Sequence, residues 1–221
     1  MTKLQAPPKR RRGRPSKISR EQVLDTARSL SAEELTMPEV AKILGVKTPA
    51  LYHHFSSREA LIGEVGQQLF SDMPIPDPDP ANWREWLHDI NMRLYRFVLA
   101  NPLLIEAADS AQGFLSLTLS LCEAILDTVQ NAGFDKEKSY WIMISLTQLA
   151  YAAARNQLEG RSTEGGGDDK LAEQIQAIKE HNPRSAEFMQ HLPESNNEEW
   201  LEQLLRWTID CIPDPTPDKP L

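Results

Sequence analysis

The segment TMPEVAKILGVKTPALYHHF, residues 36–55, carries a row of side chains whose chemistry suits DNA. Lysine and threonine can bond to base edges, while proline and alanine can contact the methyl group of thymine. Tyrosine and histidine can reach phosphates, as can an arginine and the amide groups at a helix start. The candidate DNA-binding residues in this segment and directly after it are Thr36, Lys47, Thr48, Pro49, Ala50, Tyr52, His53, Ser57 and Arg58.

A basic arm, PKRRRGRPSK at residues 8–17, precedes this segment. Arg12 and Arg14 flank a glycine and are followed by Pro15, the core of an AT-hook pattern. The narrow minor groove of A·T-rich DNA attracts arginine, and glycine leaves room at its floor. The same arm also fits a disordered tether that binds phosphates without sequence preference. Both interpretations bring the arm to DNA.

The elements that must position these residues are short helices, marked by capping patterns. Gly45 follows the second expected helix at 36–44, where a left-handed turn needs a residue without Cβ. A further helix starts after this glycine, and the helix at 19–30 packs before the pair. The plan is a helix-turn-helix, in which the helix that follows Gly45 enters the major groove. A fourth helix runs to about residue 72. The four predicted starts are Ser19 with Gln22, Thr36 with Glu39, Thr48 with Pro49, and Ser56 with Glu59.

The rest of the chain also shows helical periodicity, and no segment alternates like a strand, so the predicted fold class is all-α. Proline clusters at 73–80 and 213–220 mark a connector and a tail. Further helices are expected at 82–100, 102–109, 112–132, 135–160, 169–180, 184–191 and 195–212. The expected domains are a disordered arm at 1–18, a helix-turn-helix domain at 19–65, a larger domain at 66–212 and a tail at 213–221.

Charge is divided unevenly along the 221 residues. Residues 1–58 hold 12 of the 24 Lys and Arg but only 5 of the 32 Asp and Glu, so this part is net positive and the remainder strongly negative. Such asymmetry predicts that only the N-terminal end meets a polyanion. The chain has no apolar run of the ~20 residues that a membrane helix needs and no signal peptide, which favours a cytoplasmic protein. Cys122 and Cys211 are expected to be unpaired thiols.

The helices expected at 112–132 and 195–212 carry two apolar stripes each, which indicates packing on both faces, and Leu119 lies on a stripe of the first. The helix at 195–212 lies near the chain end, so a second subunit is the expected cover for its second face. The helix at 135–160 is apolar nearly all round and carries three consecutive alanines. We therefore expect a homodimer through a four-helix bundle, with burial inside one subunit as the alternative. The candidate interface residues are Ala152, Ala153, Trp200, Leu201, Leu204, Leu205, Trp207 and Thr208.

A second apolar face of the helix at 82–100, together with residues of neighbouring helices, could line a small-molecule cavity. Each of these residues can instead serve packing, since apolar stripes at helical spacing are usually core. The candidate ligand-binding residues are Leu69, Met92, Tyr95, Leu99, Phe114, Leu117, Leu121, Tyr140, Met143, Ile144 and Thr147.

The stretch from Arg14 to about Val65 resembles the TetR family of bacterial transcriptional regulators, in its LTM, AKILGV and ALYHHFSSREAL segments. Later segments, such as WREWLHDINMRLYRFVLANP and NAGF, resemble the sensor domain of the tetracycline-repressor-like branch. The resemblance implies an all-helical homodimer that binds an inverted-repeat operator in double-stranded DNA and is released by a small-molecule effector. It implies no cofactor. The histidine and glutamate set that holds magnesium-chelated tetracycline has no counterpart, because Gln148 and Asn156 occupy the long helix.

Two other classes of function are weighed against this one. An enzyme with a DNA-binding head would need catalytic residues, yet the sequence has no Gly-rich phosphate loop, GxSxG or HExxH motif, so no catalytic or metal site is predicted. An architectural protein that binds A/T-rich DNA through the arm alone would leave the long acidic C-terminal region without a purpose.

Overall fold

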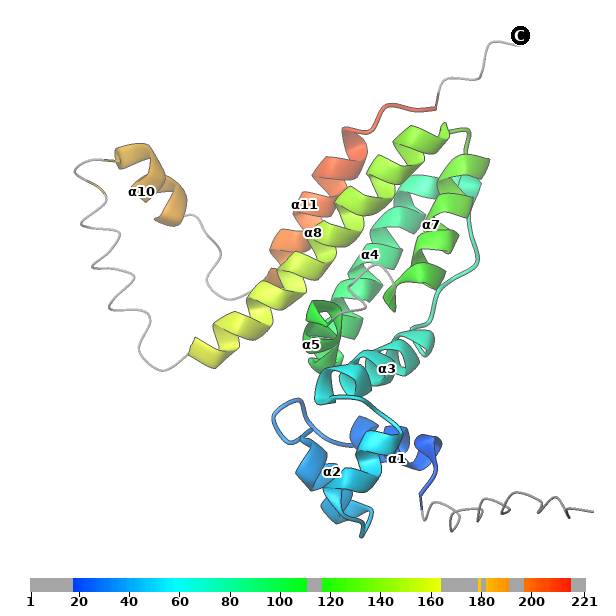
Figure 1. Cartoon of the computed structure of the whole chain (residues 1–221). Coiled ribbons are helices and arrows are strands. Elements are labelled where there is room, and N and C mark those ends of the chain that lie inside the picture. The colour runs from blue at the N-terminus through cyan, green and yellow to red at the C-terminus, as the bar shows by residue number, and fades with distance from the viewer. Residues whose placement is uncertain (1–17, 111–116, 164–178, 180–181, 191–196, 216–221) are drawn as a thin grey trace, which may run out of the picture.

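The structure is a computed structural model that describes residues 18–110, 117–163, 179, 182–190 and 197–215. Every regular element among these residues is helical, which confirms the predicted fold class. A small head lies at one end, and an elongated bundle extends from it (Figure 1). The helices are α1 (Arg20–Arg28), α2 (Met37–Ile43), η1 (Thr48–His53), α3 (Arg58–Ser71), η2 (Pro80–Asn82), α4 (Trp83–Ala100), α5 (Leu103–Asp109), α7 (Leu119–Asn131), α8 (Lys136–Thr163), α10 (Pro183–Gln190) and α11 (Asn197–Asp210).

The head consists of α1, α2 and η1 around a small apolar core. Gly45 has φ of 64°, as predicted, and closes α2 in a Schellman motif: Val46 N–H donates to Ala41 C=O at 2.9 Å and Gly45 N–H donates to Lys42 C=O at 3.1 Å. This turn directs η1 back across α2. The core residues, all less than 9% exposed, are Val23, Leu24, Ala27, Leu35, Val40, Ala41, Leu51 and Phe55.

The body of the protein is a bundle of α4, α7, α8 and α11, with α10 standing apart from it (Figure 1). Gly133, with φ of 106°, ends α7 in a second Schellman motif and turns the chain into α8. Arg84 holds the chain beyond α11, because it donates to the Ile212 carbonyl at 2.8 Å and pairs with Asp214. The bundle core includes the fully buried Leu87, Ile90, Leu94, Tyr95, Leu121, Ile125, Leu146, Leu201 and Leu205.

Three predicted details were wrong. The helix expected at 112–132 is interrupted at Thr118, and α7 begins at Leu119. Leu119 was expected on a packed apolar stripe, but its side chain is 57% exposed. Ser57 rather than Ser56 caps α3. The cap of η1 is Lys47, not Thr48, and it forms no side-chain cap bond. The helix expected at 169–180 lies almost wholly outside the described residues. Cys122 and Cys211 are unpaired thiols, as expected.

Helix α3 joins the head to the body by crossing α5 closely at Gly66. A Cβ atom at this position would overlap the Cβ of Ala107 and lie 3.5 Å from a Leu117 methyl group. A Cβ cannot rotate away, so any larger residue must push the two helices apart.

We expect Gly66→Ala to lower the free energy of unfolding by about 1–3 kcal/mol, the usual cost of overpacking. The matched control is Gly160→Ala in α8, where a new Cβ meets nothing within 4 Å. That change should be neutral or stabilise by up to about 1 kcal/mol, through helix propensity alone. Urea denaturation of both variants measures the difference, and equal effects would contradict the close crossing.

Candidate DNA-binding head and sensor domain

Two of the candidate DNA-binding residues, Thr36 and Ser57, sit at helix starts. The Thr36 hydroxyl accepts from the Glu39 N–H at 3.3 Å, and the Ser57 hydroxyl accepts from the Ala60 N–H at 3.2 Å. The other N–H groups in the first turns of α2 and α3 have no acceptor within their own helix, and such groups commonly bind phosphate. The Ser57 hydroxyl is also the main cause that lowers the pKa of the neighbouring Glu59 carboxyl.

The helix η1 presents the residues predicted to meet base edges. Its buried Leu51 faces the core, while Tyr52 is 53% exposed and Lys47, Pro49 and His53 are exposed as well. Thr48 and Ala50 are half-buried. Four of the six candidates in this segment are therefore exposed and two are only partly so, and the helix is of the 3₁₀ type.

Arg58 is placed differently from the expectation that it serves phosphates. Its Nε donates to the Leu35 carbonyl at 2.6 Å and its Nη2 to the Ala32 carbonyl at 3.0 Å. Its Nη1 pairs with Glu106 of α5 at 2.9 Å. The guanidinium is thus already engaged on three sides, and a phosphate would have to compete with these contacts.

Arg20 is a residue of the head that the sequence did not single out. It donates to the His54 carbonyl at 2.6 Å, lies 4.4 Å from the centre of the Phe55 ring and pairs with Glu64 of α3. Arg28 forms a second pair with Asp72, the residue that caps the end of α3. These pairs connect α1 to α3, so they fix the head against the connecting helix. No local motif signals them, because the partners lie 44 residues apart.

Arg12 and Arg14 of the basic arm lie outside the described residues, as does Phe114 of the candidate ligand set. The remaining ligand candidates fall into two groups. Tyr140 is 48% exposed and stacks edge-on against Trp141, so it does not belong to the bundle interior. Those that lie inside or at the margin of the bundle are Leu69, Met92, Tyr95, Leu99, Leu117, Leu121, Met143, Ile144 and Thr147.

Polar side chains accompany these apolar residues inside the bundle. The Tyr95 hydroxyl of α4 donates to the Gln157 side chain of α8. Thr147 is 2% exposed and donates to the Met143 carbonyl at 2.7 Å. Asn91 is fully buried, and its Oδ1 has no hydrogen-bond partner within the described part of the chain. Neither Asn91 nor Gln157 was predicted, because each is a single polar residue within a long helix and belongs to no recognisable motif.

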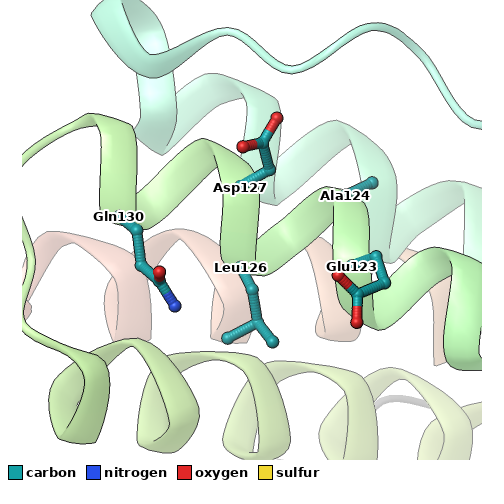
Figure 2. Close-up of a pocket in the computed structure, with 5 residues that line it drawn as sticks. All are labelled: Glu123, Ala124, Leu126, Asp127 and Gln130. Atoms are coloured by element: carbon teal, nitrogen blue, oxygen red, sulfur yellow. The ribbon is translucent and has the colours of Figure 1, made fainter.

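A surface hollow of about 430 Å³ lies along α7, lined by Glu123, Ala124, Leu126, Asp127 and Gln130 (Figure 2). Leu126 and Gln130 point toward the adjacent α8 in this view. No candidate ligand residue lines this hollow. Within the described residues, no group of three or more His, Cys, Asp or Glu could hold a metal ion.

The candidate interface residues divide between the inside and the outside of the subunit. Leu201 and Leu205 are fully buried against the bundle, and Ala153 is 4% exposed. Trp207 is 67% exposed, Trp200 is 41% exposed and Ala152 is exposed, while Leu204 and Thr208 are half-buried. One stripe of α11 therefore packs within the subunit, and the tryptophan stripe faces outward. Beside it lies an apolar hollow of about 370 Å³, lined by Phe134, Lys138, Trp141, Ile142, Thr208, Cys211, Ile212 and Pro213.

A helix-turn-helix head with an exposed second helix, joined through α3 to a larger helical bundle, defines a DNA-binding transcriptional regulator. Residues 23–65 match the family described as bacterial regulatory proteins, tetR family. This chain therefore carries the N-terminal DNA-binding domain of the TetR family of transcriptional regulators. A helical C-terminal domain with the fold of that in ActR follows it. The family is non-enzymatic, so the alternative of an enzyme with a DNA-binding head is rejected.

Individual proteins resemble this chain in sequence or in fold. The class C tetracycline repressor of Escherichia coli is 25% identical over 171 residues, which cover 72% of this chain and 74% of that protein. Apo ActR of Streptomyces coelicolor has the same fold, with a TM-score of 0.72, 20% identity and coverage of 87% of this chain and 95% of the other. ActR in complex with actinorhodin superposes with a TM-score of 0.70 at 18% identity, again over 87% and 95%. No described helix is long and apolar enough to cross a membrane.

Proposed function

We propose that this regulator acts as a cytoplasmic repressor: a homodimer that binds an inverted-repeat operator and leaves it when a small molecule binds the bundle. The proposed organisation is an arm at 1–18, the DNA-binding domain at 19–65, the sensor and dimerisation domain at 66–212 and a tail at 213–221. The observation that carries the proposal is that one chain has both an outward-facing η1 in the head and an exposed tryptophan stripe on α11.

The dimer is supported by the apolar surface that one subunit leaves uncovered. Trp141 of α8 and Trp200 and Trp207 of α11 are between 41% and 67% exposed, and these two helices pack side by side (Figure 1). Apolar patches of this kind usually mark protein contacts. A two-fold contact here would join α8 and α11 to their mates in a four-helix bundle. It would also fix the separation of two heads, which must match about one DNA turn, ~34–36 Å.

The effector site is proposed among the buried side chains between α4, α7 and α8. The mixture of apolar residues with Tyr95, Gln157, Asn91 and Thr147 suits a small molecule that is largely apolar and carries a few polar groups. ActR, which shares the fold, has been solved with actinorhodin. An effector must bind the DNA-free state more tightly than the DNA-bound state, since otherwise it shifts nothing.

The direct test of the proposal is selection of binding sites by the full-length protein from random-sequence DNA. We expect an inverted repeat whose half-sites lie about one helical turn apart. A single half-site would contradict the dimer. Recovery of A/T-rich DNA without symmetry would instead favour the architectural alternative.

Salt dependence provides a second expectation. If the dimer neutralises ~8 phosphates, log affinity should fall against log salt with a slope of about −7. Fluorescence anisotropy with the selected operator, measured over a series of KCl concentrations, gives this slope. A nearly flat response would contradict docking through phosphates.

A further inference from the structure

Arg58 is a side chain that touches both the head and the sensor domain. It begins α3, and its guanidinium bonds to the carbonyls of Ala32 and Leu35 in the loop between α1 and α2. The same guanidinium pairs with Glu106, which belongs to α5 of the sensor domain. Leu35 directly precedes Thr36, the residue that caps α2. Arg58 thus joins α5 to the start of the helix-turn-helix.

The chemistry of arginine suits this joint. Its planar guanidinium has five N–H donors in a fixed fork, so it can serve two carbonyls and a carboxylate at once. Both partners of the ion pair are only partly exposed, 32% for Arg58 and 41% for Glu106, and charge-assisted hydrogen bonds of this kind are strong. Three directions of the fork are occupied in the absence of DNA.

The position of Glu106 is itself restrained. Its neighbour Ala107 is fully buried against Gly66 of α3, at the close crossing of α3 and α5. A movement of α5 along or away from α3 must therefore carry the Glu106 carboxylate with it. Because α2 packs on η1, a change at Leu35 reaches the helix that presents Lys47 and Tyr52.

We propose that Arg58 is a positioning residue for DNA binding rather than a phosphate contact: Glu106 orients it, and it holds the head in the geometry that fits DNA. Operator affinity is therefore set partly by a carboxylate on the sensor domain. This inference rests on the proposed operator binding through α2 and η1.

The Glu106→Ala variant tests the sign of the effect. Loss of one negative charge from an otherwise intact body should tighten binding to a polyanion if only electrostatics act. Positioning predicts the opposite: operator binding about tenfold weaker, within the range by which coupling residues act. The control is Glu123→Ala on α7, an exposed carboxylate outside the head and outside α3 and α5, which should leave affinity unchanged or slightly raised.

Two substitutions at Arg58 complete the test. Arg58→Lys keeps the charge that attracts a phosphate but cannot hold three acceptors, so it should weaken binding as much as Glu106→Ala does. Arg58→Ala should weaken binding without flattening the salt slope, whereas loss of one phosphate contact in each subunit would flatten it by about 2. The double variant Arg58→Ala with Glu106→Ala should be no weaker than the more severe single variant, because the pair acts as a unit.

The measurements are anisotropy with the selected operator and circular dichroism to confirm that each variant is folded. Wild-type protein that selects no operator would overturn the proposed function itself. If the wild-type protein binds the operator and either Glu106→Ala or Arg58→Lys binds it at least as tightly as the wild type does, only the positioning role is overturned. Since Arg58→Lys keeps size and charge, it decides the question even if an alanine variant is unstable.

Discussion

A Trp207→Arg variant should be a folded monomer that no longer binds the operator. Trp207 is 67% exposed in one subunit, whereas its neighbours Leu201 and Leu205 are fully buried in the bundle, so the subunit core does not depend on it. Buried tryptophans at interfaces commonly contribute 2 kcal/mol or more, and two-fold symmetry removes the contribution twice. The dimer dissociation constant should therefore rise by about a thousandfold or more.

Sedimentation velocity at micromolar concentration separates the two states. The matched control is Leu119→Arg on α7, which places the same side chain at another exposed apolar position, outside the α8 and α11 face. That variant should remain a dimer with normal operator affinity. If Trp207→Arg sediments as a dimer, the proposed interface is wrong. A monomer that still binds with wild-type affinity would show that the two heads are not coupled through the bundle.

Local signals in the sequence predicted the helices and the turn of the head well. Capping residues and Gly45 act within one or two turns of their own position, so the pattern alone locates α1, α2 and the turn. Ser56 shows the limit of this approach: it fits the capping-box pattern with Glu59, yet the backbone makes Ser57 the cap of α3, although Ala60 stands three residues after it.

The contacts that connect distant segments were not predictable. Arg58 fits a phosphate contact when judged by type and place, yet its acceptors are two backbone carbonyls and a carboxylate 48 positions later. The division of α11 into a buried and an exposed stripe was anticipated only as two apolar faces. Which of them meets α4 and α8 depends on the packing of the whole bundle.

Lys47 and Tyr52 are expected to make the largest contributions of the head to operator binding. Both side chains are exposed on or beside η1, and neither takes part in a side-chain hydrogen bond or ion pair in the described part of the protein. Each is therefore free to meet DNA, and neither supports the fold. A contact to a base edge contributes about 1–3 kcal/mol, and a dimer loses it twice, so alanine at either site should weaken binding by about 2–6 kcal/mol.

The two substitutions can be told apart by what else they change. Lys47→Ala should relax the preference at one base pair of each half-site if the ammonium bonds to a base, or flatten the salt slope by about 2 if it meets a phosphate. Tyr52→Phe isolates the hydroxyl, since the ring and its exposure are retained. The charge-matched control is Lys136→Ala at the start of α8, an exposed lysine at the end of the bundle remote from the head (Figure 1). The free energies of unfolding of these surface variants should match the wild type within about 0.5 kcal/mol, so a loss of affinity would report on DNA contact and not on folding. Operator affinity that survives in both Lys47→Ala and Tyr52→Ala would contradict the assignment of η1 as the recognition helix.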